Sequence, residues 1–450
     1  MKAQRQRLRR LNLAFLLAFA GIGLSLVYWS SIRAPAILSR PDNPRLVEAE
    51  LRIQRGRIID SQDRILAETT GAPDLLERHY PYAVAAPAVG YYSLRHGTAG
   101  IEEGLDALLR GETDDWRIWL QRSVLHTPQI GNDVRLTLDA AWQQTADTIL
   151  GDRRGAVLLF TLPDSAIRVM VSHPTYDPNQ LDSEFENLVD DENAPLLNRA
   201  TQGQYQPGLA LQPFILAGAT ATGRLSLDNR VADGDAPVEV LGSVLRCISQ
   251  PEENMRLADA LRYACPAPML TLLNVLQPAD LQQIFVDFGL TSAPELPLVV
   301  EAPESSPPQD MRLSILGQEN LTVTPLQLGI AWMALGNKGV LNQPRLVAAV
   351  TTKGIWQTYT KLSEPQQVIP NHIAAAILAA LPRQEDVIEH AALALSGPGG
   401  SANSWYLALS PANDPQMAVV VIVEESQDVG AAQAVGRSLL EAVLSQGTAE

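Results

Sequence analysis

A long apolar run lies close to the N-terminus of the chain. Residues 11–32 carry no charged side chain, and five basic side chains precede them: Lys2, Arg5, Arg7, Arg9 and Arg10. A run of this length can span a bilayer as a helix, and preceding basic residues favour a cytoplasmic N-terminus. We therefore expect a cytoplasmic tip at residues 1–10, a single-pass anchor at residues 11–32, and the bulk of the chain outside the cytoplasm.

A cleaved signal peptide is the alternative interpretation of this run. Ala34-Pro35-Ala36 resembles a cleavage site, but the apolar run is long for a signal peptide and a proline is unfavourable there. Tyr28 and Trp29 lie where an interfacial aromatic belt would fall. We favour the uncleaved anchor.

Beyond the anchor, the hydrophobic pattern divides the chain into a membrane-proximal region, 33–135, and a larger region, 136–450. In the first, residues 55–67 indicate a strand, a polar turn and a second strand. In the second, strand patterns at both ends enclose helical patterns. The expected strands are 155–160, 167–172, 404–409 and 417–423, and the expected helices are 209–218, 256–276, 326–335 and 429–444. This arrangement predicts an α+β domain.

Composition narrows the classes of function. The chain has 450 residues, of which 46% are hydrophobic and 19% charged, and its net charge is −16. An acidic balance argues against nucleic-acid binding. The acidic stretch Asp190-Asp191-Glu192 is interpreted as a solvated loop, so we expect neither a metal site nor a cofactor.

The chain contains two cysteines, Cys247 and Cys265. If the anchor is correct, both lie in an oxidising compartment, where a disulfide can form. Two free buried thiols are the alternative. We predict a disulfide between them.

A set of spaced motifs, in a fixed order, resembles one protein family. The motifs are Arg55-Gly56-Arg57-Ile58-Ile59-Asp60, Leu136-Thr137-Leu138-Asp139, His173-Pro174-Thr175-Tyr176-Asp177-Pro178-Asn179, Tyr205-Gln206-Pro207-Gly208 and Gly317-Gln318 followed by Thr324-Pro325-Leu326-Gln327-Leu328. They are similar to those of class B penicillin-binding proteins, especially the small penicillin-binding protein A type, and they span about residues 50 to 425.

This resemblance implies a fold and an activity. The fold is a penicillin-binding or serine β-lactamase-like transpeptidase domain, in which an antiparallel sheet carries helices on both faces. A noncatalytic pedestal, here residues 33–135, precedes it. Members of the family cross-link peptidoglycan stem peptides and are acylated by β-lactams.

The first catalytic motif of the family is degenerate here. After the Tyr205 and Gly208 turn, the family places S-x-x-K at the start of a helix, but this chain has Leu209 and Gln212. Acyl transfer needs a nucleophile and a base within hydrogen-bond reach. Leucine has no lone pair, and glutamine is no base at neutral pH. The segment also fits a plain buried helix, with Leu209 in the core.

The second motif, S-x-N, matches Ala264-Cys265-Pro266. Neither Ala264 nor Pro266 can relay a proton. Cys265 could serve as a replacement nucleophile only beside a base or cation that lowers its pKa, and the sequence shows no such neighbour. We favour the disulfide for this cysteine.

The third motif, K-T-G-[TS], matches Pro398-Gly399-Gly400-Ser401. Pro398 replaces the lysine and Gly399 the threonine, so the ammonium that would hold a substrate carboxylate is missing. Gly400 and Ser401 fit the pattern. Together with Tyr205 and Gly208, they are the residues that we expect in a remaining substrate cleft.

Three functions follow from these observations. The first is a catalytically inactive homologue in the bacterial plasma membrane, which acts as a scaffold or regulator of cell-wall synthesis or division. The family's partners, such as polytopic glycan polymerases, bind through the anchor and pedestal. The second is a module that binds stem peptide, and the third is an active transpeptidase with an unrecognised nucleophile.

Overall fold

The computed structural model describes residues 2–33, 50–72, 75–112, 128–303, 306–359, 364–397 and 400–447. Helix α1, Lys2–Val27, continues as the π-helix η1, Tyr28–Arg33. Within the described residues, Arg10–Val27 is the one helix long and apolar enough to cross a membrane. Its apolar side chains are exposed, among them Phe19 at 69% and Leu24 at 72%. Exposure of this kind fits the expected anchor, because lipid rather than protein would cover the helix.

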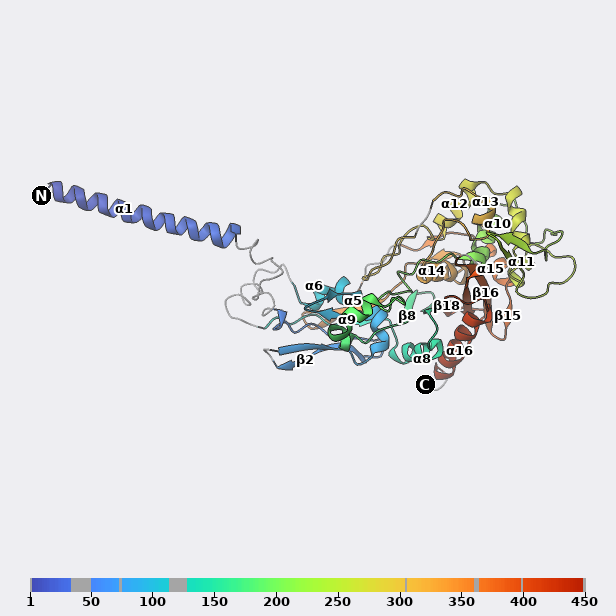
Figure 1. The fold of residues 1–450 in the computed structure, drawn as a ribbon, viewed down its shortest axis with the longest axis horizontal. Helices are drawn as coiled ribbons and strands as arrows, with labels where there is room; N and C mark the ends of the chain where they lie inside the picture. The colour runs from blue at the N-terminus through green and yellow to red at the C-terminus, as the bar shows by residue number, and fades with distance from the viewer. Residues whose placement is uncertain are drawn as a thin grey trace.

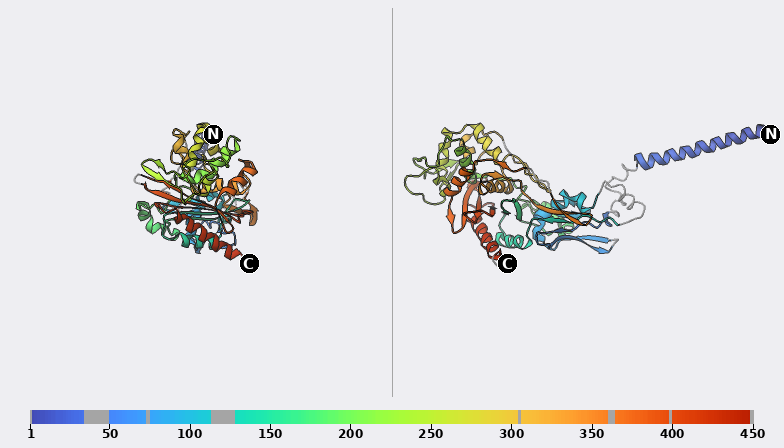
Figure 2. Two further views of the ribbon diagram at one scale, coloured as in Figure 1. Left: turned by 90° about the vertical axis from the view of Figure 1, so that its right-hand side faces the viewer. Right: turned by 180° about the vertical axis from the view of Figure 1, so that it is seen from behind.

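The pedestal contains a six-stranded sheet with the order β13-β12-β6-β1-β2-β3. Four of its strands come from the membrane-proximal region: β1, Ile58–Ile59; β2, Ile65–Ala72; β3, Leu75–His79; and β6, Val134–Leu136. The expected pair around the polar turn is present, with Ile58 opposite Ala67. The other two strands come from far along the chain: β12, Val347–Thr352, and β13, Ile355–Thr358. The later region therefore helps to build the pedestal sheet, which lies between α1 and the second sheet (Figures 1 and 2).

Short elements follow β3 along the chain, and buried ion pairs link one of them to the residues beside the pedestal sheet. The elements are η2, Ala83–Ala85; α4, Ala86–Val89; β4, Tyr92–Ser93; β5, Gly97–Thr98; α5, Gly100–Gly104; and α6, Asp106–Leu109. Glu102 on α5 is fully buried and pairs with Arg55 at 2.8 Å and with Arg78 at 2.7 Å. Two guanidinium groups thus neutralise one buried carboxylate.

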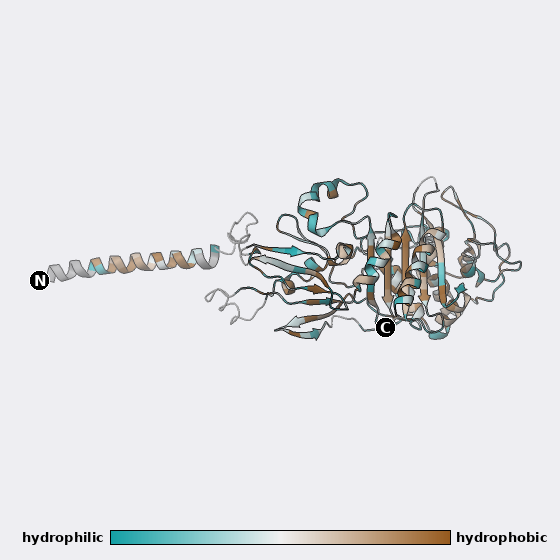
Figure 3. Cartoon of the chain, turned by 90° about the horizontal axis from the view of Figure 1, so that it is seen from below, coloured by the Kyte–Doolittle hydropathy of each residue, from teal (hydrophilic) through white to brown (hydrophobic). Residues whose placement is uncertain are grey.

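The second sheet is antiparallel throughout and has the order β15-β16-β17-β18-β7-β8. Its strands are β7, Gly155–Thr161; β8, Ala166–His173; β15, Arg383–Gln384; β16, Val387–Leu395; β17, Ala402–Ser410; and β18, Met417–Val423. The four strands expected from the sequence are therefore confirmed. Most of this sheet is hydrophobic (Figure 3).

Helices cover both faces of this sheet, as expected. Successive strand residues point to opposite faces. Val157 and Leu159 pack with α8, Ala140–Leu150, and α16, Gly430–Gly447, whereas Leu158 and Phe160 join the larger core around α14, Pro325–Gly336. Asp139 caps α8 by accepting hydrogen bonds from the N–H groups of Ala141 and Trp142.

The remaining elements belong to the connections between these strands and helices. They are η3, Pro178–Gln180; α9, Leu181–Asp190; η4, Gly208–Leu211; α10, Gln212–Ala221; β9, Val238–Val240; β10, Ser243–Leu245; α11, Asp259–Arg262; η5, Ala267–Asn274; α12, Pro278–Asp287; α13, Met311–Ile315; β11, Val340–Leu341; β14, Gln366–Gln367; and α15, Asn371–Ala380. The helix expected over 256–276 is instead two short elements. Ala264 has φ of +45° and Pro266 follows, so the α-helix stops there.

Candidate functional site

A tight turn at residues 205–208 places Leu209 against the sheet. Tyr205 and Val323 exchange backbone hydrogen bonds of 3.0 and 2.9 Å, and the N–H of Gly208 donates to the Gly317 carbonyl at 3.0 Å. Gly208 has φ of +53°, and a Cβ there would lie 2.5 Å from the carbonyl oxygen of Leu393 on β16. Only glycine fits this approach. The start of η4 therefore packs closely against β16.

Leu209, which the motif comparison matches to the family's serine, is packed into the core. Its side chain is 2% exposed and belongs to the main hydrophobic cluster. Its carbonyl oxygen lies 3.1 Å from Nε2 of His390 on β16. The side chain offers no atom that could accept an acyl group.

Gln212, which the motif comparison matches to the family's lysine, forms a hydrogen bond with the segment matched to the second motif. Its side chain is fully buried, and its Nε2 donates to the carbonyl oxygen of Cys265 at 2.8 Å. Its Oε1 has no hydrogen-bond partner in the described part of the chain. The neutral amide of Gln212 thus holds the backbone carbonyl of Cys265.

The predicted disulfide between Cys247 and Cys265 is confirmed. Cys265 is fully buried, and its neighbours Ala264 and Pro266 are buried too. Because its sulfur is bonded to Cys247, Cys265 carries no thiol that could act as a nucleophile.

Two of the residues matched to the third motif are described by the structure. Pro398 and Gly399 lie outside the described residues. Gly400, with φ of +83°, and Ser401 directly precede β17. The strand that faces Leu209 is β16, and the side chain directed at the turn is His390.

His390 was not identified from the sequence. Its side chain is 1% exposed, and burial lowers its pKa to about 4, against the opposing effect of the backbone carbonyls of Leu209 and Leu261. The imidazole is therefore neutral at pH 7. The sequence did contain a signal for this strand, because Gly-Pro-Gly-Gly predicts a turn. A turn at these residues implies that a strand precedes Gly397, and His390 falls within that strand.

Four side chains around the Leu209 turn are buried and uncharged. Leu209, Gln212, Ala264 and His390 are each at most 3% exposed, and they carry no charge at neutral pH. Acylation requires a nucleophile with a base beside it and space for the substrate. At these positions the chain has apolar packing and neutral hydrogen bonds.

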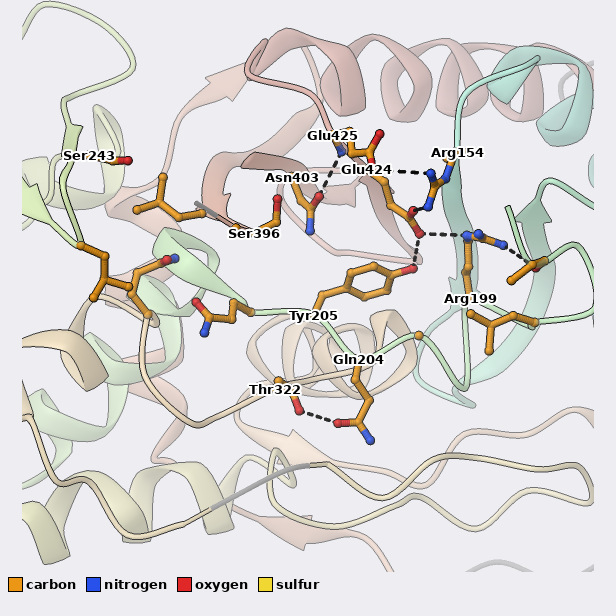
Figure 4. Close-up of a pocket in the computed structure, with 18 of the residues that line it drawn as sticks. Arg154, Arg199, Gln204, Tyr205, Ser243, Thr322, Ser396, Asn403, Glu424 and Glu425 are labelled. Atoms are coloured by element: carbon orange, nitrogen blue, oxygen red, sulfur yellow. Dashed lines mark hydrogen bonds and ion pairs between the residues drawn. The ribbon is translucent and has the colours of Figure 1, made fainter. Parts of the chain in front are cut away.

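An open cleft lies next to this packed region, beside Tyr205 (Figure 4). Its volume is about 760 Å³, and Tyr205 lines it, whereas the other expected cleft residues, Gly208, Gly400 and Ser401, do not. The hydroxyl of Tyr205 donates to Oε1 of Glu424 at 2.6 Å. Burial and the Glu424 carboxylate raise the pKa of Tyr205, so the phenol stays protonated.

Glu424 also binds two arginines from different parts of the domain. Arg199 lies 2.8 Å and Arg154 2.9 Å from its carboxylate (Figure 4). Arg154 also pairs with Glu425 at 3.4 Å, so two arginines and two glutamates balance one another at one end of the cleft.

Two family models match the chain in succession. Residues 55–134 match the penicillin binding protein A dimerisation domain, and residues 155–444 match the penicillin binding protein transpeptidase domain. The peptidoglycan D,D-transpeptidase PbpA of Mycolicibacterium smegmatis is 28% identical over 98% of this chain and 99% of that protein. The peptidoglycan D,D-transpeptidase MrdA of Escherichia coli is 24% identical over 64% of this chain and 54% of that protein.

Solved structures show the same fold. Penicillin-binding protein A of M. tuberculosis, determined as an imipenem acyl-enzyme complex, superposes with a TM-score of 0.79 at 25% identity and covers 88% of this chain and 100% of that one. A D,D-transpeptidase domain from Eggerthella lenta has a TM-score of 0.76 at 22% identity and covers 88% of this chain and 99% of that one. The transpeptidase model matches well over half of the residues. The chain belongs to the penicillin-binding protein transpeptidase family.

Proposed function

We propose that this protein is a catalytically silent, membrane-anchored member of the family, which acts as a scaffold or regulator of a cell-wall synthesis complex in the bacterial plasma membrane. The proposal rests on the identity and the burial of residue 209. A buried leucine, with neutral Gln212 and His390 around it, stands where acylation would occur. Removal of the nucleophile from a serine hydrolase costs about a millionfold in turnover.

The parts that could bind a partner support the same proposal. The apolar side chains of α1 are exposed, and the pedestal has a six-stranded sheet with a buried ion cluster around Glu102. The regions that would bind a partner are thus folded, whereas the positions matched to the first catalytic motif hold Leu209 and Gln212. Partner binding through the anchor and pedestal, for example to a polytopic glycan polymerase, is consistent with this division.

Labelling with a fluorescent penicillin tests the catalytic half of the proposal. The full-length chain in detergent should remain unlabelled. Penicillin-binding protein A of M. tuberculosis, which forms a penicillin G acyl-enzyme complex, serves as the positive control. A covalent, boiling-resistant adduct on this chain would contradict the proposal.

Crosslinking in cells tests the scaffold half. We expect a glycan polymerase to be recovered with the full-length chain and lost when residues 2–32 are deleted. A matched variant, in which residues 11–32 are replaced by an unrelated apolar helix of equal length, keeps the protein in the membrane. Equal recovery with all three chains would contradict a role for the anchor, and absence of the polymerase from all of them would contradict the scaffold.

A further inference from the structure

We infer that one end of the pedestal sheet rests on the lipid bilayer, through exposed apolar side chains that basic side chains flank. We call this end the pedestal tip, and define it by Leu94, Ile130, Lys353 and Ile355. The inference rests on the membrane anchor of the proposed function. It adds a second contact with the membrane, which the folded domain itself makes.

The strand register brings separate segments together at the pedestal tip. Gln54 forms a parallel bridge with Ile130, in line with the parallel pairing of β1 and β6. Strand β12 runs antiparallel to β6, with Val350 opposite Val134. Continued along the chain, this register places the β12–β13 turn at residues 353–354 level with Ile130. Residues that are distant in the sequence therefore meet at one end of the sheet.

The pedestal tip is also the end that receives the chain from the anchor. The π-helix η1 ends at Arg33, and the described chain resumes at Glu50, shortly before Gln54. Residues 34–49 can span at most about 60 Å when fully extended, so the anchor holds this end of the sheet near the bilayer. The tip of the β2–β3 hairpin lies at the same end of the sheet, on the side of α1 (Figure 1).

The exposed apolar side chains of the pedestal gather at this end. Among its described residues, the large hydrophobic side chains that are exposed are Leu94 at 43%, Ile130 at 60% and Ile355 at 68%. Leu94 lines a hollow with Leu76, near the tip of the β2–β3 hairpin, and Ile130 lines another with Trp356. Single exposed hydrophobic residues are common on soluble proteins. Their collection at the membrane-facing end indicates a surface that is covered in the cell.

Basic side chains flank the apolar ones. Lys353 lies in the β12–β13 turn and Arg95 in the β4–β5 turn, and both are exposed. Of the carboxylates nearby, Glu50 is paired with Arg110, and Glu77 lies on the opposite edge strand, β3. Basic groups beside apolar ones suit a bilayer surface, because the cation reaches the lipid phosphates while its alkyl stem stays in the interface.

A bilayer fits the pedestal tip better than a protein partner does. The apolar side chains project from separate segments, whereas a stable protein interface buries about 800 Å² of continuous surface on each partner. Lipid headgroups can rearrange around separate side chains. The covalent anchor also raises the local concentration of lipid at the tip, so contacts that are weak individually are sufficient.

Fluorescence quenching of the full-length chain in nanodiscs tests this inference. Ile355→Cys is labelled with the environment-sensitive dye NBD, which reacts only at the new thiol because Cys247 and Cys265 are bonded to each other. The nanodiscs contain phosphatidylcholine and phosphatidylglycerol, with or without a lipid that carries a nitroxide quencher close to its headgroup. The nitroxide quenches only dyes that lie in or against the bilayer.

Two further labelling sites serve as controls. Leu26→Cys, in α1, is the positive control for insertion of the anchor. Val286→Cys is the matched control, because Val286 is also an exposed aliphatic residue but lies on α12, on the side of the molecule away from α1 (Figure 1). Thermal unfolding of each labelled chain checks that these exposed substitutions leave the fold intact.

The nitroxide lipid should remove at least about half of the emission at positions 26 and 355, because interfacial side chains lie about 5–10 Å into the headgroup boundary. The dye at position 286 should keep its emission. Adding Lys353→Glu to the Ile355→Cys chain should reduce the quenching severalfold in nanodiscs that contain phosphatidylglycerol, since it replaces an attraction to anionic lipid by a repulsion.

Several results would overturn the inference. Quenching at position 26 without quenching at position 355 would leave the anchor standing and remove the tip contact, whereas quenching at neither position would contradict both. Equal quenching at positions 286 and 355 would show that the domain has no preferred membrane-facing end. Disulfide crosslinking between unlabelled Ile355→Cys chains, with no quenching of the labelled ones, would assign the tip to a second copy of the chain. These results are independent of penicillin labelling, which tests the proposed catalytic silence.

Discussion

Replacing Leu209 by serine, the residue that the family carries at this position, should destabilise the protein instead of restoring a reaction. The Leu209 side chain is 2% exposed within the main core. Shortening a buried leucine to alanine costs about 2–5 kcal/mol through lost burial and the cavity left behind. A serine hydroxyl in the same place adds a buried polar group. We therefore expect the free energy of unfolding to fall by about 3–5 kcal/mol.

The assay is thermal unfolding of the full-length chain, followed by penicillin labelling. At about 2 °C per kcal/mol for a domain of this size, the unfolding temperature should fall by roughly 6–10 °C. Leu209→Met is the control, because a swap of similar volume usually costs less than about 1.5 kcal/mol. Neither variant should react with penicillin, since Gln212 and His390 remain neutral.

The opposite outcome would refute the reasoning. If Leu209→Ser unfolds at the same temperature as the natural protein, residue 209 faces open space. If that variant also forms a covalent adduct with penicillin, the rest of the site has kept its catalytic capacity. Either result would mean that the position is a vacant active site instead of packed core.

The remaining predictions concern His390, the disulfide and the pedestal. The pKa of His390 is lowered from 6.5 to about 4 in the folded state, so the unfolded state binds more protons between these values. The free energy of unfolding should therefore fall by up to about 3 kcal/mol as pH drops from 6.5 to 4, and His390→Gln should remove that slope in chemical denaturation; an unchanged slope contradicts the assignment. Replacing Cys247 and Cys265 by alanine should lower the free energy of unfolding by about 3 kcal/mol, and equal unfolding temperatures with and without reductant would count against this. Glu102→Gln, which leaves Arg55 and Arg78 buried beside a neutral group, should cost about 3–5 kcal/mol; a loss below about 1 kcal/mol, the value of an exposed pair, would show that the cluster is solvated.

Elements with strong local patterns were predictable from the sequence. The hairpin β7–β8, the strand pair β17–β18 and the helices α14 and α16 follow continuous apolar runs bounded by turn residues. The disulfide predicted from the two cysteines is also present. Local chemistry determines these features.

Other features depend on contacts between distant residues. The strands β12 and β13 join the pedestal sheet because Val347 pairs with Leu136, a contact that no local pattern encodes. Strand β16 contains Glu389 and His390 and is rich in alanine, so it lacks a clear strand pattern. His390 could be identified as a site residue only from the structure, in which it lies against Leu209.

The cleft beside Tyr205 could not be derived from the sequence for the same reason. Gln318, Asn403 and Glu424 come from three separate segments, and their convergence depends on the packing of α13 and β17 and on the chain after β18. The Tyr205 turn itself was predictable, because glycine is required where a backbone approaches closely at positive φ. The motifs thus pointed to the Leu209 region and to Tyr205, but not to the cleft as a whole.

Intact-mass spectrometry of the full-length protein after incubation with excess penicillin G tests the central claim most directly. Our account predicts a single species at the mass of the unmodified chain, because Leu209 offers no acyl acceptor and Cys265 is bonded to Cys247. A second species, heavier by one penicilloyl group and mapped by peptide sequencing to any side chain, would contradict it.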